Sequence, residues 1–199
     1  MMTPSRVPHD RLLGAIARLV AFNPAGFDAI EASPAGFLAS LAPLLAFTLV
    51  GAGAELVVMG WRVGLDDGLQ MLCVLLGQPV ISHLYARLWH REAFWLRYAT
   101  AMNWCQLALP VVGLGLLLLI TLANGGIGGV DTFAIVFALL FSYSVLLNWF
   151  LAWRGLALGP WRGLAFLFAV TLTLALVLSV PLGLRLAQRP HHPAPALSL

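Results

Sequence analysis

The chain has 199 residues, of which 61% are hydrophobic and 10% are charged. This composition excludes an ordinary soluble domain and predicts an all-α, polytopic membrane protein. The net charge of +3 would suit a nucleic-acid partner in a soluble protein, but the arginines lie between apolar runs, where membrane topology explains them better. We therefore expect the lipid bilayer as the partner of the chain, and no nucleic acid.

The N-terminal segment, residues 1–33, is expected to lie in the cytoplasm and at the membrane interface. Within it, residues 11–22 follow Asp10, a helix-capping residue type, and place Arg11 and Arg18 on one face. The other face is apolar and carries Leu12, Leu13, Ile16, Leu19 and Val20. This separation predicts an amphipathic, interfacial helix that precedes the bundle.

A short repeat predicts where the next two helices begin. NPAGF at 23–27 and SPAGF at 33–37 each give an N-capping side chain followed by Pro at the first helical position. The first helix is expected to be short and interfacial. The second is expected to continue as the first membrane span.

Five apolar runs are long enough to cross a membrane, which needs roughly 20 residues for about 30 Å of hydrocarbon. They lie at about 35–59, 68–88, 97–122, 132–153 and 162–184, within a membrane domain over 34–186. The chain is thus predicted to be a bundle of five transmembrane helices. The second run is the most polar, and an alternative in which it is re-entrant stays open. Residues 187–199 are rich in proline and are expected to form a disordered tail.

The arginines predict the orientation of the bundle. With the N-terminus in the cytoplasm, eight arginines fall in cytoplasmic segments and three in outer segments. The eight are Arg6, Arg11, Arg18, Arg87, Arg91, Arg97, Arg154 and Arg162, and the three are Arg62, Arg185 and Arg189. Because basic residues are retained on the cytoplasmic side, we expect a multi-pass protein with its N-terminus in the cytoplasm and its C-terminus on the outer side.

Two Asn-Trp pairs stand inside apolar runs, at Asn103-Trp104 and Asn148-Trp149. At 1.5 Å per residue, both asparagines lie roughly 8 to 9 Å inside the cytoplasmic boundary, where a buried amide needs a partner. The expected partners are each other or His83, which lies at a similar depth in the second span. A polar cluster is therefore predicted in the cytoplasmic half of spans two to four, made of His83, Asn103, Gln106, Tyr143 and Asn148.

This polar cluster has two interpretations. The first is that its groups form interhelical hydrogen bonds, each worth on the order of 1 kcal/mol. The second is a ligand or proton site that faces the cytoplasm, with His83 as the titrating group. The first is favoured, because a lone histidine in a helix is more often only hydrogen-bonded.

Glu55 is the carboxylate that lies inside an apolar run, in VGAGAELVVMG. It could pair with Arg62 or Arg185, which is the favoured interpretation, or take part in transport. Glu55 and Gln78, which precedes the helix-interrupting Pro79, are considered a candidate intramembrane charge and gate. The GAGA before Glu55 would let a neighbouring backbone approach closely.

Catalytic and metal-binding motifs are absent from the sequence. There is no HExxH, GxSxG or GxxxxGK[ST] motif, and no two carboxylates share a face of a span. Cys73 and Cys105 lie about 10 Å apart in depth, beyond the usual limit of about 7 Å between the Cα atoms of a disulfide, so free thiols are expected. We expect no enzyme, no cofactor and no metal site.

Two stretches, FDAIEASPAGFLASLAPLLAF at 27–47 and RYATAMNWCQLALPVV at 97–112, resemble a group of proteobacterial five-span inner-membrane proteins of unassigned function. The residues that carry the resemblance are Phe27-Asp28, Pro34-Ala35-Gly36-Phe37 and Asn103-Trp104. More distantly, the group is similar to the Yip family, whose eukaryotic members bind Rab GTPases and act in vesicle traffic. The chain has no counterpart of the acidic-Leu-x-Gly-Pro signature of those members, so the resemblance implies a layout in the membrane and no functional residue.

We favour a non-enzymatic integral inner-membrane protein that acts in membrane organisation or in the assembly or regulation of other membrane proteins. The alternative is a small transporter or channel that uses the polar cluster of spans two to four. The two differ in whether Glu55 and His83 line a cavity or only pair with neighbours. Their depths differ by about 15 Å at 1.5 Å per residue, so a path would need further polar groups between them. The partners considered are other membrane proteins, or a second copy of this chain bound through the GAGA face.

Overall fold

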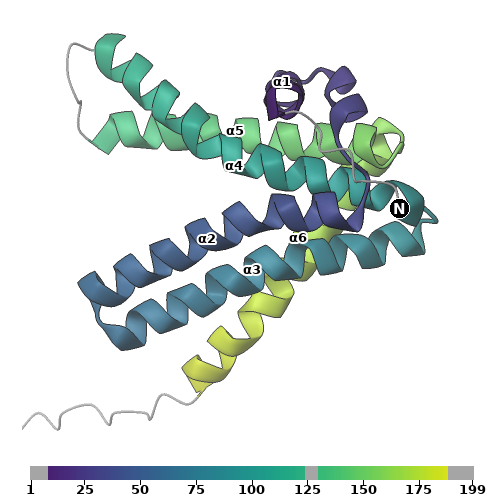
Figure 1. Ribbon diagram of the computed structural model, residues 1–199. Helices are drawn as coiled ribbons and strands as arrows, with labels where there is room; N and C mark the ends of the chain where they lie inside the picture. Colours follow the sequence, from purple (N-terminus) through teal and green to yellow (C-terminus); the bar gives the residue numbers. More distant parts are fainter. Residues whose placement is uncertain (1–8, 124–129, 188–199) are drawn as a thin grey trace, which may run out of the picture.

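The computed structural model describes residues 9–123 and 130–187, and this part of the chain contains helices and no strand. The helices are α1 (His9–Val20), the 3-10 helix η1 (Pro24–Ala29), α2 (Pro34–Met59), α3 (Trp61–Leu88), α4 (Glu92–Ala123), α5 (Val130–Gly155) and α6 (Pro160–Ala187) (Figure 1). The predicted disordered tail lies outside the described residues, apart from Ala187, which ends α6.

Five of the described helices, α2 to α6, are long and apolar enough to cross a membrane. Each predicted span falls within one of them. The second is a single helix of 28 residues, so this segment has no re-entrant turn. It begins at Trp61 rather than near residue 68, because Asp66 and Asp67 interrupt the apolar run but not the helix. By length and composition, the described chain is a multi-pass membrane protein.

The two helix starts predicted from the repeat are confirmed by their caps. Asn23 Oδ1 accepts a hydrogen bond from the backbone N–H of Ala25 at 3.0 Å. Ser33 Oγ accepts one from the backbone N–H of Gly36, also at 3.0 Å. In both cases proline stands in the first turn, where a missing N–H leaves no hydrogen bond unmade.

Part of the apolar side of α1 packs against the rest of the protein. Ala15 and Leu19 are buried, whereas Leu13 is largely exposed. At the end of α1, the hydroxyl of Tyr143 in α5 donates a hydrogen bond to the backbone oxygen of Val20 at 2.6 Å. The apolar face predicted for the membrane surface is therefore divided between protein contacts and an exposed part.

The five long helices are arranged as two hairpins and the single helix α6. α2 packs along α3, α4 packs along α5, and α6 packs against both α3 and α5. Figure 1 shows the two hairpins close together at the end where α1 lies and separated at the opposite end. We call the first the closed end and the second the open end. At the closed end α2, α4 and α6 begin and α3 and α5 finish.

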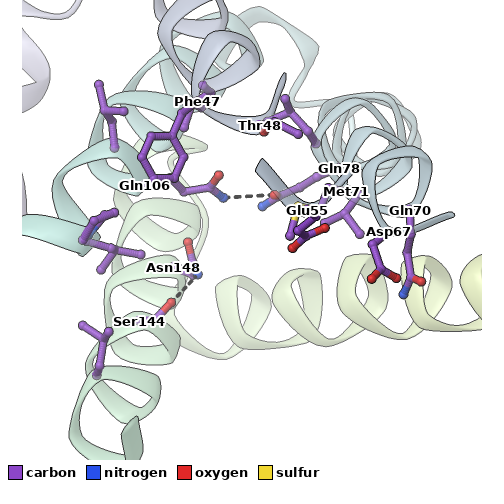
Figure 2. A pocket seen from close by; sticks show the side chains of 17 residues that line it. Phe47, Thr48, Glu55, Asp67, Gln70, Met71, Gln78, Gln106, Ser144 and Asn148 are labelled. Atoms are coloured by element: carbon purple, nitrogen blue, oxygen red, sulfur yellow. Dashed lines mark hydrogen bonds between the residues drawn. The ribbon is translucent and has the colours of Figure 1, made fainter. Parts of the chain in front are cut away.

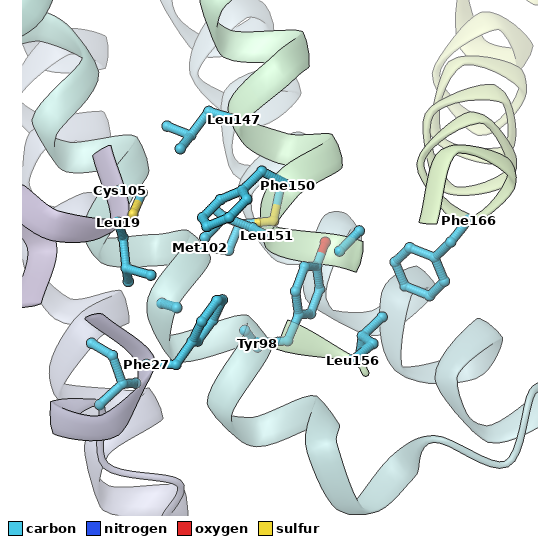
Figure 3. Packing of buried hydrophobic residues seen from close by; sticks show 14 of the residues in the cluster. Leu19, Phe27, Tyr98, Met102, Cys105, Leu147, Phe150, Leu151, Leu156 and Phe166 are labelled. Carbon is cyan, nitrogen blue, oxygen red and sulfur yellow. The ribbon is translucent and has the colours of Figure 1, made fainter. Parts of the chain in front are cut away.

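The buried core lies at the closed end, where η1, α4, α5 and α6 meet (Figure 3). Tyr98 of α4 and Phe166 of α6 pack edge to face, with ring centroids 5.7 Å apart. On the other side of α4, Phe27 of η1 lies 6.4 Å from the ring of Phe150 in α5. Leu151 of α5 is fully buried between these groups. Aromatic packing therefore joins the two hairpins to α6 and to the N-terminal segment.

Polar side chains also join helices near the closed end. Asn103 of α4 donates to Ser40 Oγ of α2 at 3.0 Å. Trp95 Nε1 of α4 donates to Ser82 Oγ of α3 at 3.1 Å. Both bonds connect one hairpin to the other, so they fix the relative position of the hairpins at this end.

The first hairpin is closely packed towards the open end, because α3 carries glycines there. A Cβ atom at Gly64 would lie 2.5 Å from the backbone nitrogen of Leu56, and one at Gly68 would lie 2.8 Å from Ala52 Cβ. Gly51 and Gly53, the glycines of the GAGA stretch, face open space instead. The predicted close approach of a neighbouring backbone to α2 is therefore present. The glycines that allow it, Gly64 and Gly68, belong to α3 and have the spacing GxxxG, whereas the prediction named the GAGA stretch of α2.

Candidate functional site

The predicted polar cluster does not form one connected group. The ring of His83 packs against Trp95 with centroids 4.6 Å apart, and its Nδ1 has no hydrogen-bond partner among the described residues. Tyr143 reaches α1 instead of a neighbouring span. Gln106 of α4 donates to Gln78 Oε1 of α3 at 3.0 Å.

The expected pairing of the two asparagines with each other or with His83 is wrong. Asn103 is buried and donates to Ser40 of α2, a residue that the sequence analysis did not single out. Asn148 donates to Ser144 on its own helix at 3.4 Å. Equal depth did not bring the two amides together, because they face different neighbours. Asn103 is thus a structural link between the hairpins.

Four of the seven predicted site residues line one cavity between the two hairpins, namely Glu55, Gln78, Gln106 and Asn148 (Figure 2). The cavity has a volume of about 690 Å³, within the range of sites that hold small molecules. Its lining is Leu44, Phe47, Thr48 and Glu55 from α2, Asp67, Gln70, Met71, Val74, Leu75 and Gln78 from α3, Gln106, Leu107, Leu109 and Pro110 from α4, and Leu140, Ser144 and Asn148 from α5. His83, Asn103 and Tyr143 are not among these residues.

One face of α3 supplies much of the polar lining. Asp67, Gln70, Val74 and Gln78 follow one another at intervals of three and four residues, which places them on the same side of a helix. Asp67 was not predicted as a site residue because the span was expected to begin near residue 68, and Gln70 was not singled out although it lies within that span. The spacing from Gln78 back to Asp67 is the signal that could have identified them.

On the side of the cavity nearer the core, the lining includes the hydrogen bond between Gln106 and Gln78. The second amide of this pair, Gln78 Nε2, donates to the sulfur of Met102 at 3.6 Å. Beyond it lies a hollow of about 10 Å³ beside Ser82 and Asn103, which is about the space of one water molecule. The Gln78–Gln106 pair is therefore the floor of the cavity, and the packed core lies below it.

Glu55 is the most unusual polar group of the lining. Its Oε2 is buried and has no hydrogen-bond partner among the described side chains. The side chains of Arg62 and Arg185, its predicted partners, lie outside the described part of the structure. An ionised carboxylate without a donor is costly away from water. The position therefore favours a positively charged ligand.

The lining offers groups that can bind a molecule. Its described residues supply carboxylates, amides and hydroxyls, and no histidine or cysteine. Among the described residues, no three His, Cys, Asp or Glu side chains gather to hold a metal ion. Cys73 is exposed and Cys105 is buried, and both are free thiols, as predicted.

Comparison of the chain with known protein families, with curated proteins and with solved structures gives no match. The function therefore has to be argued from the cavity itself, because a helical bundle alone is compatible with many functions.

Proposed function

We propose that this chain is a non-enzymatic protein of a bacterial inner membrane that binds a small solute in the cavity between its hairpins and moves it across the bilayer. The observation that carries the proposal is the cavity of about 690 Å³ with polar groups from four membrane helices. Polar groups within membrane spans are costly unless they have partners or contact water, and they commonly mark solute pathways. A path between Glu55 and His83 needs further polar groups between them, and the lining adds Asp67 and Gln70 to Gln78.

The distribution of arginines supports a direction for the cavity. The eight arginines that the sequence assigns to cytoplasmic segments support an orientation with the closed end in the cytoplasm and the open end towards the periplasm. In this orientation α1 lies at the cytoplasmic surface, where the exposed Arg11 and Arg18 would meet anionic headgroups. The cavity then opens outward, and the Gln78–Gln106 pair separates it from the cytoplasm.

A change between two arrangements of the hairpins would open the floor. The hairpins are linked at the closed end by Asn103–Ser40 and Trp95–Ser82, close to the Gln78–Gln106 pair. Pro79 follows Gln78 directly and removes one backbone hydrogen bond of α3 at this level. Such interrupted helices are the points at which transporters bend. We therefore place the moving part of the protein at the floor of the cavity.

The test is solute flux in liposomes that contain the purified full chain. A panel of small cations, neutral solutes and anions is offered outside, and uptake is compared with that of protein-free liposomes. We expect uptake of at least one class of solute, and we expect Gln106→Leu to remove most of it because the floor loses its polar pair. Tyr143→Phe is the matched control, since it removes a polar group that lies outside the cavity.

Flux that is absent for every solute, or that Gln106→Leu leaves unchanged, would contradict the proposal. Membrane organisation or the assembly of other membrane proteins would then be the better hypothesis, in line with the resemblance to the Yip family. Its own test is the identification of proteins that copurify with the mildly solubilised chain. Within the described residues, no surface distinguishes a protein partner from ordinary lipid contacts, so this role stays a prediction from the sequence.

A further inference from the structure

The lining of the cavity has an unbalanced charge. Among the described residues, the lining contains two carboxylates, Glu55 and Asp67, and no arginine, lysine or histidine. Both carboxylates come from the first hairpin, and Figure 2 shows them on the same side of the cavity. In a membrane protein the field of a carboxylate is weakly screened. The cavity therefore attracts cations and repels anions.

The environment of Glu55 strengthens the preference of the cavity for cations. Its buried Oε2 lacks a hydrogen-bond donor among the described residues, and the glycine that packs on the backbone of Glu55, Gly64, brings no side chain to satisfy it. An ionised carboxylate in this position becomes favourable only when a positive charge lies near it. A bound cation would supply that charge.

The other groups of the lining indicate what kind of cation fits. About half of the lining residues are apolar, among them Phe47, Leu75 and Leu107. A bare Ca²⁺ or Mg²⁺ ion prefers six or more oxygen ligands in a small cage, and this cavity is far larger than one ion. Phe47 adds an aromatic ring, whose face attracts organic cations. The side-chain amides of Gln106 and Asn148 can orient a polar substituent of the bound cation.

We infer that the cavity binds a monovalent organic cation with an apolar body, and that Glu55 is its counter-charge. The inference rests on the proposed function, because it names the class of solute that enters the same cavity. The charged group lies towards the α2–α3 side, and the apolar body contacts the leucines and Phe47. Release towards the cytoplasm requires the Gln78–Gln106 floor to open.

The experiment measures binding of two probes of the same shape and opposite charge, tetraphenylphosphonium and tetraphenylborate, to the detergent-solubilised full chain by equilibrium dialysis. We expect saturable binding of the phosphonium and none of the borate. Glu55→Gln keeps the size of the side chain and removes its charge, and should weaken binding at least about tenfold. Glu55→Asp keeps the charge and should retain most of the binding.

Glu92→Gln is the matched control, because Glu92 is an exposed carboxylate at the closed end, outside the cavity. It should bind the phosphonium like the unmodified chain. If Glu55→Gln does not fold, as judged by circular dichroism and gel filtration, Asp67→Asn tests the second carboxylate of the same lining and should also bind more weakly. Equal binding of both probes, or unchanged binding by the folded Glu55→Gln or Asp67→Asn variant, would overturn the inference.

The outcome separates this inference from the proposed function. Saturable, Glu55-dependent cation binding without flux in liposomes would support the inference and contradict transport. Flux of neutral or anionic solutes that depends on Gln106, without cation binding, would support transport and contradict the inference.

Discussion

The closed and open ends of the bundle are built from the same kind of apolar helix but are held together differently. At the closed end, the rings of Tyr85, Trp89 and Tyr98 pack around Phe166, and side-chain hydrogen bonds connect the two hairpins. Towards the open end, close packing occurs within the α2–α3 hairpin at Gly64 and Gly68, while the hairpins separate around the cavity (Figure 1).

This difference separates a packed base from a cavity. At the base, polar groups that bond across the hairpins, such as Asn103 with Ser40, accompany a buried core. In the cavity, polar groups from four helices gather at one place, and Glu55 has an oxygen without a hydrogen-bond partner among the described residues. Polar groups inside a membrane are retained at a cost, so their concentration in this cavity is the strongest indication of function in this chain.

The largest effect is expected from a change in the core of the closed end. Phe166 is 1% exposed and packs on Tyr98, so Phe166→Ala should lower the free energy of unfolding by about 3 kcal/mol or more through the space it leaves. Phe168→Ala is the matched control, because Phe168 is 67% exposed on the same helix. Unfolding in mixed micelles by added SDS, followed by tryptophan fluorescence, measures both. Equal losses would show that the core does not lie at the closed end.

An intermediate effect is expected from the glycines that join α2 and α3. Gly64→Ala places a Cβ atom against the backbone of Leu56 and should lower the free energy of unfolding by about 1–3 kcal/mol. Gly53→Ala adds the same atom where nothing lies within 4 Å, and should be neutral or slightly stabilising because alanine favours helix. The same SDS titration compares them. Indistinguishable variants would contradict the close packing of this hairpin.

A smaller effect should distinguish the two kinds of buried amide. Asn103→Ala removes the bond to Ser40 at the closed end and should cost about 1 kcal/mol of stability. Gln106→Ala changes the floor of the cavity, where the hairpins already separate, and should change stability by less than about 0.5 kcal/mol. The same SDS titration measures the free energy of unfolding of both variants. A larger loss for Gln106→Ala would place the structural link at the cavity instead of the closed end.

The helices and their starts could be predicted because they depend on neighbouring residues in the sequence. The apolar runs determine the spans, and Asn23 and Ser33 bond to backbone groups two and three residues further on. Such local signals need no knowledge of the tertiary arrangement.

The partners of the polar groups could not be predicted in the same way. The rise per residue gives the depth of Asn103 and Asn148, but not the direction each faces or which helix lies there. Asn103 faces α2, and Asn148 bonds within α5. Predicting Asn103–Ser40 would have required the packing order of the hairpins.

Only part of the cavity lining could be predicted from the sequence. Glu55 and Gln78 are recognisable as polar residues in apolar runs, but Asp67 lies just outside the second span predicted at about 68–88. The polar lining from α3 could have been predicted from the helical face that runs from Asp67 to Gln78. The close packing of α3 on α2 could have been predicted from the GxxxG spacing of Gly64 and Gly68.

The most direct test of the account is whether water enters the cavity from the open end. Cys73, an exposed thiol, is first replaced by serine, while Cys105 is buried and can remain. Ser144→Cys then places a thiol in the cavity, and Ser142→Cys places one on the same helix outside it. A membrane-impermeant thiol reagent is added to intact cells, because only a hydrated thiol forms the reactive thiolate. The account predicts labelling of Ser144→Cys from the periplasmic side and none of Ser142→Cys. Equal labelling of the two variants, or no labelling of Ser144→Cys, would contradict a hydrated cavity that opens outward.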